Sequence, residues 1–445
     1  MSHDVTFPAS PRDWHRRVWR LAAPIILSNI STPILGAVDT AVVGHLPDPA
    51  YIGGVSLGAV IFSFVFWGFG SMRMSATGLT AQALGAGDKP EFVAILNRSL
   101  LLAVVLGAAV ILLQWPLAEA AFFLLEASAR VEAQTAIYYD VLIWGAPAAV
   151  ATFAASGWLI GAQRTTAALV VQLTLTGLNM VLDFVFVLGF GWGVAGVALA
   201  TLISHYVALA VALVACLRVR RQIAGGIVAA RILEPARLSA MFAINTDMFL
   251  RTLMLLFGFA YFTAESAKLG DVVLAANTVL LHLQNLYAFT LDGFAHAAEA
   301  LVGQAFGARR RQAFSTAVRV STIWACAFAV FAALIILALG PTLIDLMTGI
   351  TDVRATAAIY LPWLIASPLL SVWSFQLDGI FVGATRSADM RNAMLLSLLV
   401  FLVAVWLLPP SFGNHGLWLA LMLFMLGRGV TLAVLYPRLP QALPS

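Results

Sequence analysis

Two carboxylates, an amide and a hydroxyl in the first half of the chain have the residue types and spacing of a cation-binding pocket. Asp39 lies in an apolar run, Asn179 and Asp183 are four residues apart on one predicted helix face, and Thr201 stands in the next run. A carboxylate inside a membrane span should face a partner, a cavity or a cation. Neighbouring carboxylates make a proton carrier, whereas added amide and hydroxyl oxygens suit Na⁺. The alternative is that Asn179 and Asp183 only hydrogen-bond across helices.

A polar stripe runs along one apolar segment of the second half. Asp292, His296 and Glu299 are four and three residues apart, and Asn277 precedes them in the same segment. This spacing places them on one helix face, where they can bind a cationic substrate or relay protons. The alternative for Glu299 is an interfacial carboxylate at the end of the span.

Further charges stand inside other apolar segments. Asp247 and Arg251 are spaced i,i+4 and are expected to neutralise one another. Arg73 can pair with a carboxylate or extend to the interface, and Asp378 is a further candidate for the substrate cleft. No Cys or His group has metal-ligand spacing and no phosphate-binding loop is present, so we expect neither an enzyme nor a cofactor.

The composition explains where these polar groups must lie. Of the 445 residues 61% are hydrophobic and 10% are charged, which is typical of a membrane protein. Twelve apolar runs are long enough to cross a bilayer as helices. They begin near residues 21, 53, 95, 135, 166, 193, 237, 271, 316, 356, 391 and 414. Most Lys and Arg fall on one side of these spans, which predicts that both termini are cytoplasmic.

An internal repeat divides the spans into two halves. The sequence QALGA at residues 82–86 returns as QAFGA at 304–308, and the same offset of 222 residues relates Gly157 to Gly379 and Gly191 to Gly413. Six spans per half predict two six-helix lobes related by a pseudo-two-fold axis along the membrane normal. We expect a cytoplasmic N-terminal segment (1–20), an N-lobe (21–217), a cytoplasmic linker (218–236) with a glycine pair at 225–226, a C-lobe (237–436) and a C-terminal tail (437–445).

The repeat also identifies polar residues that belong to one half alone. At the offset of 222 the partners of the first-half pocket are apolar or aromatic, namely Tyr261, Phe401, Val405 and Leu423. The repeat therefore indicates that these first-half residues were added for function.

Several motifs resemble the multidrug and toxic compound extrusion (MATE) transporters, and within them the DNA-damage-inducible F (DinF) branch. They are GAVDT at residues 36–40, GHL at 44–46, MSATGLTAQA at 74–83, LDGFA at 291–295 and LDGIFVGATR at 377–386. The resemblance implies two six-helix lobes in a V shape, with Asp39 as the coupling residue. The family's cation pocket matches Asn179, Asp183 and Thr201, and also Tyr138, although Tyr139 can serve in its place.

The expected function is an antiporter that exports organic cations and amphipathic toxic compounds by alternating access, with H⁺ preferred to Na⁺ as the coupling ion. The alternative is a flippase for lipids or lipid-linked precursors, but Arg73, Arg251 and Arg428 are too few and too scattered for the cationic cleft it needs. We expect a monomer in the bacterial inner membrane, surrounded by lipid, that binds small molecules and no nucleic acid.

Overall fold

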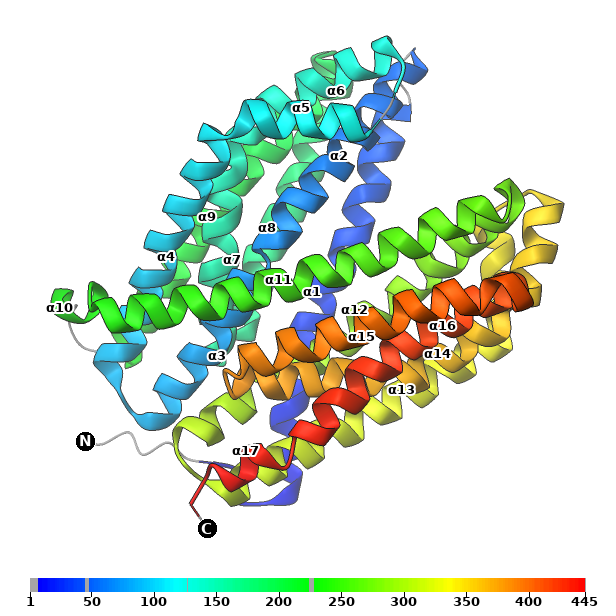
Figure 1. Cartoon of the computed structure of the whole chain (residues 1–445). Coiled ribbons are helices and arrows are strands. Elements are labelled where there is room, and N and C mark those ends of the chain that lie inside the picture. Colours follow the sequence, from blue (N-terminus) through cyan, green and yellow to red (C-terminus); the bar gives the residue numbers. More distant parts are fainter. Residues whose placement is uncertain (1–6, 45–47, 126, 224–227, 445) are drawn as a thin grey trace. The chain divides into compact units, whose positions relative to one another are not determined.

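The computed structural model describes residues 7–44, 48–125, 127–223 and 228–444 (Figure 1). The end of the GHL motif and the glycine pair of the predicted linker lie outside these residues. Within the described chain the regular structure is helical and contains no strand. Cys216 and Cys326 are free thiols.

Twelve helices or helix pairs of the described chain are long and apolar enough to cross a membrane, which confirms the predicted fold class. They are α1 (Pro11–Gly44), α2 with α3 (Pro49–Phe69 and Ser71–Ala86), α4 (Lys89–Leu112), α6 with η1 and α7 (Ala129–Leu142, Ile143–Gly145 and Ala146–Gly161), α8 with η2 (Thr165–Asp183 and Phe184–Gly189), α9 (Gly193–Ile223), α11 (Pro235–Lys268), α12 (Asp271–Gly307), α13 (Arg311–Met347), α14 (Thr351–Gly383), α15 (Ser387–Leu407) and α16 (Pro409–Leu435). Three shorter helices are α5 (Gln114–Leu124), α10 (Ala229–Ile232) and α17 (Arg438–Gln441).

Most of these helices begin before the apolar run that predicts them. α1 begins at Pro11 and α13 at Arg311, whereas their apolar runs begin near residues 21 and 316. Hydrocarbon offers no hydrogen bonds to the backbone, so a spanning segment must be helical throughout. Its helix then continues into polar residues, because nothing at the membrane surface requires it to stop there.

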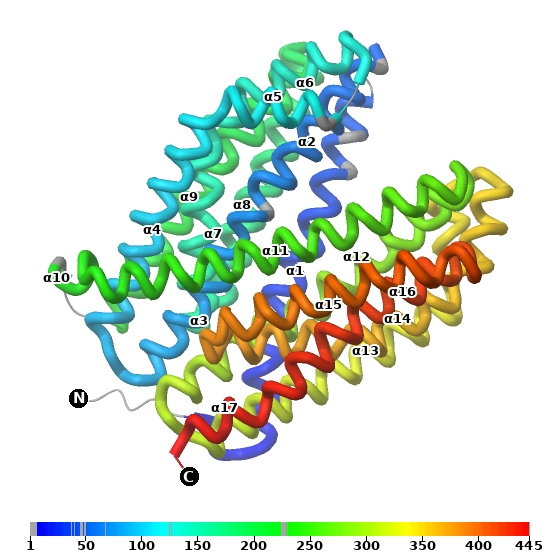
Figure 2. Tube along the Cα trace, viewed as in Figure 1, coloured from blue at the N-terminus to red at the C-terminus, as the bar shows by residue number. Residues whose placement is uncertain are grey.

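The chain forms two compact units. Unit 1 comprises residues 1–26, 85–87 and 246–445, and unit 2 comprises residues 27–84 and 88–245. In unit 1, α12 packs against α13 and α14, and α15 packs against α16 (Figure 2). In unit 2, α4 packs against α7 and α8 packs against α9. Both α1 and α11 change unit part of the way along their length, at Ile26 and at Asn245.

The 222-residue repeat is visible in the backbone. Residues with positive φ recur at this offset in equivalent places, as the pairs Gly87 (69°) and Arg309 (53°), Gln163 (59°) and Thr385 (54°), and Gly191 (70°) and Gly413 (55°). Left-handed backbone is uncommon outside glycine, so its return at a fixed offset shows that both halves use the same turns.

Each unit also contains the same close approach of two helices. In unit 2 a Cβ atom on Gly157 would collide with the backbone of Arg73, and in unit 1 a Cβ atom on Gly379 would collide with the backbone of Ala295. One turn further on the contacts repeat, Gly161 against Thr77 and Gly383 against Glu299. We call these contacts the glycine seams: α3 against α7 in unit 2, and α12 against α14 in unit 1.

Candidate functional site

Four helices of unit 2 bring the predicted pocket residues together. Asp39 lies on the part of α1 that belongs to unit 2, and Tyr138 lies on α6. Asn179 and Asp183 share a face of α8, and Thr201 faces them from α9. The residues come from distant parts of the chain, and their side chains are linked by the contacts described next.

Asn179 connects the hydroxyl of α9 to the carboxylate of α8. With its amide nitrogen toward Asp183 it donates to Oδ2 at 2.7 Å, and its oxygen accepts from the Thr201 hydroxyl at 2.8 Å. In the opposite orientation it donates to Thr201 and turns its oxygen toward the carboxylate, which leaves both groups as acceptors. The first orientation satisfies both neighbours, so we adopt it. Asn179 and Asp183 are almost completely buried.

The two carboxyl groups meet directly. The side chains of Asp39 and Asp183 interact with one another, although they come from α1 and α8. Carboxylates lack a donor, so the two groups can form a hydrogen bond when one of them carries a proton. The Oδ1 atoms of both residues are buried and have no hydrogen-bond partner among the described residues. The pocket therefore offers two buried acceptors that make no hydrogen bond within the described residues.

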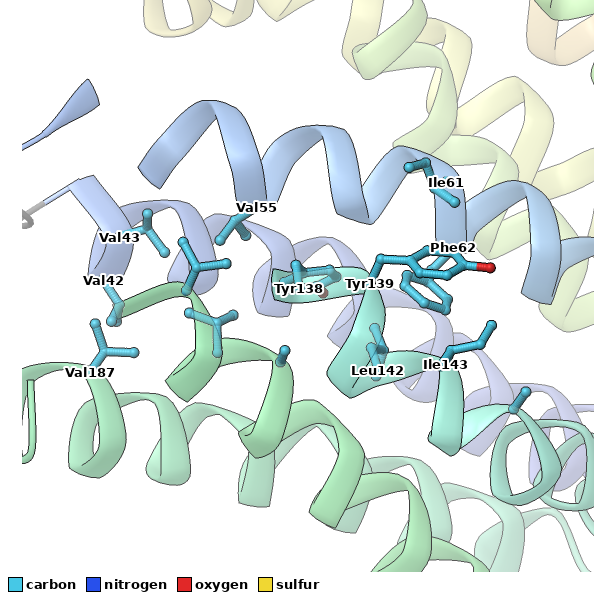
Figure 3. Close-up of a cluster of buried hydrophobic side chains, with 14 of the residues drawn as sticks. Val42, Val43, Val55, Ile61, Phe62, Tyr138, Tyr139, Leu142, Ile143 and Val187 are labelled. Atoms are coloured by element: carbon cyan, nitrogen blue, oxygen red, sulfur yellow. The ribbon is translucent and has the colours of Figure 1, made fainter. Parts of the chain in front are cut away.

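Tyr138 and not Tyr139 belongs to the pocket. The Tyr138 side chain interacts with Asp39, Asp183 and Thr201, whereas the Tyr139 hydroxyl donates to the carbonyl oxygen of Gln114 at 2.7 Å. Gly58 on α2 leaves room for the Tyr138 ring, because a Cβ atom there would collide with it. Figure 3 shows both rings within the apolar cluster of unit 2.

A π-helical turn follows Asp183. Residues Phe184–Gly189 form η2, and the Phe190 N–H donates to the carbonyl oxygen of Val185, five residues back. A π-turn inserts one extra residue into a helix and often occurs at functional sites. Sequence analysis missed this feature, and the apolar letters FVFVLG give no signal for it.

Unit 1 holds a separate group of buried charges. Arg251 of α11 and Arg428 of α16 both donate to Oδ2 of Asp378 on α14, the second at 2.6 Å. All three side chains are buried. The expectation that Arg251 and Arg428 are scattered is therefore wrong, because they converge on one carboxylate.

The expected pairing of Asp247 with Arg251 is also wrong. Asp247 instead accepts from Arg391 at 2.5 Å and from the Ser387 hydroxyl at 2.8 Å, both on α15. The i,i+4 spacing permits a contact along one helix, but in this structure each of the two groups bonds a residue on a neighbouring helix instead.

The polar stripe of α12 divides into two parts. Asn277 exchanges hydrogen bonds with Asn414 and accepts from the Trp418 indole at 2.8 Å, so it belongs to a network between α12 and α16. His296 and Glu299 lie about five turns further along, with Nε2 and Oε1 3.8 Å apart. The stripe is therefore not one site, and Glu299, 2% exposed, is buried inside unit 1.

Arg73 lies in the glycine seam of unit 2. Its backbone touches Gly157, its carbonyl oxygen accepts from the Thr77 hydroxyl at 2.8 Å, and its residue is half-buried. Whether its guanidinium serves a substrate stays a prediction.

The pocket of unit 2 is the part of the chain best suited to an ion. In the described residues no three His, Cys, Asp or Glu side chains gather as a transition-metal site would require. The groups that do gather are oxygens of Asp39, Asp183, Asn179 and Thr201, which are the ligands of a hard cation, and two of them also fit a proton.

Twelve apolar helices in two repeated units, with an acidic pocket buried in one of them, are the architecture of a secondary transporter. Comparison with known proteins agrees. A family model described as MatE matches residues 24–185 and 248–407, one segment for each repeat. The chain is 39% identical over 430 residues to DNA damage-inducible protein F of Escherichia coli, covering 95% of this chain and 92% of that protein.

More distant relatives share the length and the fold. The multidrug export protein MepA of Staphylococcus aureus is 22% identical over 405 residues, 88% of each chain. A solved MOP superfamily transporter from Pyrococcus furiosus superposes with a TM-score of 0.87 at 19% identity, covering 96% of both chains. The chain therefore belongs to the MATE family of multidrug transporters, and its likeness to the DinF branch is confirmed. Its apolar helices and bacterial relatives fit a multi-pass inner membrane protein.

Proposed function

We propose that this chain is an antiporter that exports organic cations and amphipathic toxic compounds, driven by protons that bind between Asp39 and Asp183. The observation that supports the proposal is the direct approach of two carboxyl groups from α1 and α8, a pair that can hold one proton between them. A site that gains or loses this proton can couple to transport if the two transport states bind it unequally.

The proton also has a sufficient driving force. When one proton enters for each monovalent cation that leaves, no net charge crosses the membrane, so the pH gradient drives the exchange. Each pH unit supplies about 1.4 kcal/mol, which sustains a concentration ratio of about ten for the substrate cation. Asp39 lies on α1, whose Pro24 and Pro33 each remove a backbone hydrogen bond. A helix weakened in this way beside an ionisable group is suited to change shape when the group is protonated.

Na⁺ is the competing ion. The pocket has amide and hydroxyl oxygens in addition to carboxylates, which a sodium site would use. We favour the proton because two neighbouring carboxyl groups raise the proton affinity of one of them and so form a proton carrier.

The flippase alternative is weaker than the antiporter. A site for lipid phosphate needs free cationic groups, but Arg251 and Arg428 both bond Asp378. Their convergence therefore does not supply the positive cleft that this alternative requires.

Transport into proteoliposomes tests the proposal. Uptake of a fluorescent cationic dye is measured under an imposed pH gradient or an imposed Na⁺ gradient, for the wild type, Asp39→Asn and the control Asp140→Asn. Asp140 is exposed on α6, the helix of Tyr138, so its loss should leave transport unchanged. We expect the pH gradient to drive the wild type and the control, and Asp39→Asn to lose at least about tenfold of this rate.

Three outcomes would contradict parts of the proposal. Equal transport by Asp39→Asn and wild type under both gradients would remove Asp39 from coupling. Transport driven by Na⁺ alone would replace the proton as the ion. Absence of dye uptake under either gradient would exclude the proposed substrate class.

A further inference from the structure

One end of unit 1 gathers arginine side chains that the transport proposal does not use. It is formed by the start of α1, the turns from α12 to α13 and from α14 to α15, and the chain after α16. We call it the arginine end, and its segments are residues 7–20, 308–319, 384–391 and 436–444. These segments contain eleven arginines, two aspartates and no lysine or glutamate.

Contacts within unit 1 bring the four segments to the same end. Arg17 of α1 donates to Gln304, near the end of α12, at 3.1 Å. Phe314 of α13 stacks on Tyr436 after α16, with ring centroids 6.3 Å apart. The glycine seam shows that α12 and α14 run in the same direction, so the turns that follow them lie at one end. Figure 1 shows the start of α1, the α12–α13 turn and α17 gathered there.

Most of these arginines are exposed, and seven have side chains that form no hydrogen bond or ion pair with the described residues. These seven are Arg12, Arg16, Arg386, Arg438 and the run of three at 309–311. The acidic residues of the four segments are Asp13, which bonds the Ser10 hydroxyl at 2.7 Å, and Asp389. Two carboxylates leave most of the positive charge uncompensated, so an anion that binds among the arginines relieves their repulsion.

The opposite end of unit 1 has the reverse charge. Its segments are residues 265–271, 345–354 and 408–415, which contain four carboxylates, one lysine and one arginine. Both basic groups are paired, Lys268 with Glu265 at 2.7 Å and Arg354 with Asp345 at 3.3 Å. Unpaired positive charge is therefore a property of one end and not of the whole surface of this unit.

The internal repeat shows that the shared fold does not require arginines in the α12–α13 turn. The three arginines at 309–311 correspond to Gly87, Asp88 and Lys89 of unit 2, whose own charges sum to zero. Asp88 in addition bonds Arg231. Arg309 has a positive φ of 53°, where its counterpart is glycine at 69°. Glycine adopts this backbone more readily, so the geometry of the turn does not explain the arginine.

Tryptophans place the arginine end at the level of the lipid headgroups. Trp19 and Trp324 lie edge to face with ring centroids 5.1 Å apart, and Trp19 is 39% exposed. Tryptophan is enriched at the membrane–water interface, because its ring is apolar and its N–H is polar. Arg16 is three residues before Trp19, on the side of the headgroups and water. Its guanidinium is thus within reach of lipid phosphates.

Guanidinium groups suit the phosphates of phospholipids. Arginine is always charged, and its planar fork of N–H donors can bind two phosphate oxygens at once. A zwitterionic headgroup brings its own cation, which a cluster of arginines repels, whereas an anionic headgroup brings none. Each basic side chain near an anionic lipid surface strengthens binding about fivefold. The arginine end therefore favours lipids whose headgroups carry a net negative charge.

We propose that the arginine end of unit 1 binds phospholipids with anionic headgroups, whose phosphates lie among Arg12, Arg16 and the arginines at 309–311. The site goes beyond the proposed transport function and does not rest on it, because it shares no residue with the pocket of unit 2. A headgroup between the start of α1 and the α12–α13 turn neutralises charges that otherwise repel one another.

Lipid enrichment around the purified full chain tests the proposal. The protein is reconstituted into phosphatidylcholine vesicles that contain a trace of pyrene-labelled phosphatidylglycerol or of pyrene-labelled phosphatidylcholine. Energy transfer from tryptophan to pyrene measures how much labelled lipid lies beside the protein. We expect the wild type to enrich phosphatidylglycerol about fivefold over phosphatidylcholine, and to lose most of this preference at high salt, because salt screens exposed charges.

Variants of the α12–α13 turn show whether the arginines cause the enrichment. Arg309→Gln/Arg310→Gln/Arg311→Gln should remove most of the preference for phosphatidylglycerol, whereas Arg309→Lys/Arg310→Lys/Arg311→Lys should keep it, since lysine retains the charge. Lys268→Gln/Arg354→Gln removes basic groups from the opposite end and should match the wild type. If the triple glutamine variant does not fold, Arg12→Gln/Arg16→Gln takes its place.

Three results would overturn the inference. Equal enrichment of both lipids by the wild type, or an unchanged preference in the folded glutamine variants, would mean that the arginines only orient the chain in the membrane. Displacement of the labelled lipid by inorganic phosphate, but not by unlabelled phosphatidylglycerol, would make the surface a site for free anions. Displacement by a short single-stranded RNA alone would assign it to a nucleic acid.

Discussion

The pocket of unit 2 and the equivalent place in unit 1 have the same scaffold but opposite contents. Where unit 2 has Asp39 and Asn179, unit 1 has Tyr261 and Phe401, whose rings pack edge to face at 6.4 Å. Phe401 in turn packs on Phe424 at 5.3 Å, and its place is fully buried. A few side chains therefore decide which unit can hold an ion, because the repeat gives both units the same helices.

The helix that carries these side chains differs as well. In unit 2, α8 changes to a π-helical turn directly after Asp183, whereas α15 in unit 1 stays α-helical to Leu407, beyond the equivalent Val405. The distortion accompanies the acidic residue and is absent where the residue is valine. This favours the interpretation that the π-helical turn is a property of the pocket and not of the repeated scaffold.

The largest effect is expected when an acidic residue is introduced into unit 1, at the position equivalent to Asp183 of unit 2. Val405→Asp should destabilise the protein by about 3 kcal/mol, because the new carboxylate is buried beside Phe401 without an amide or second carboxyl. Thermal unfolding of the purified protein measures the effect, with Val405→Ile as the control. A variant as stable as the control would mean that this part of unit 1 already accommodates charge.

The glycine seams offer a test of what the two units share. Gly157→Val and Gly379→Val should each destabilise the protein by about 1–3 kcal/mol, because the added atoms collide with backbone of the facing helix. Gly177→Ala is the control, since a Cβ atom there meets nothing within 4 Å. Thermal unfolding should give similar losses for both seams, and a large loss at one seam alone would show that the repeat is not equivalent in packing.

Variants of the adjacent residues Tyr138 and Tyr139 test which of the two contributes to the pocket and which only to the stability of unit 2. Tyr139→Phe removes the hydrogen bond to Gln114 and should lower stability by about 1 kcal/mol without changing dye transport. Tyr138→Phe removes a hydroxyl from the pocket and should slow transport under a pH gradient with a smaller change in stability. Thermal unfolding and dye uptake are measured on both variants, and the reverse pattern would assign Tyr139 to the pocket.

The smallest expected effect concerns the start of α4 and of its repeat partner α13. Asp88 accepts from the Glu91 N–H at 3.1 Å and from Arg231 at 2.8 Å on both oxygens, whereas Arg310 at the equivalent place makes no side-chain cap. Burial alone would raise the pKa of Asp88, but the Glu91 N–H and the guanidinium of Arg231 together hold it below its usual value.

The sign of the pH dependence follows from this lowered pKa. The ionised Asp88 stabilises the fold fully above the unfolded pKa of about 3.9, and this contribution is lost as the pH falls through the lower folded value. Asp88→Asn should therefore cost at most about 1 kcal/mol at neutral pH, because the group is partly solvated, and nothing in strong acid. The free energy of unfolding, measured across this pH range, should show no such trend for Arg310→Ala. A difference between Asp88→Asn and the wild type that stays constant with pH would mean that Asp88 acts only as a helix cap.

Local patterns were sufficient to predict the fold. Apolar length and the recurrence of QALGA as QAFGA are properties of the sequence itself, so twelve helices and the repeat follow directly from them. The pocket was accessible for the same reason, because Asn179 and Asp183 share a helix face and the repeat shows which polar residues are unique to one half. Their contact with Asp39 is what the structure adds.

Contacts between distant helices were beyond sequence analysis. The spacing of Asp247 and Arg251 favours a bond along one helix, but α14 and α15 present better-placed partners that no spacing reveals. Asn277 was grouped with Glu299 by helix periodicity, although Asn414 lies nearer to it in space. A charge count within the second half would have suggested that Arg251, Arg428 and Asp378 need one another.

The division of α1 and α11 between the units has a consequence for biosynthesis. Unit 2 is complete once the chain has been made as far as Asn245, but the first 26 residues belong with a unit whose remainder follows almost entirely after that point. The first part of α1 must therefore enter the bilayer long before its partners are translated. Separate expression of the two repeats would leave each fragment without a segment that its own compact unit contains.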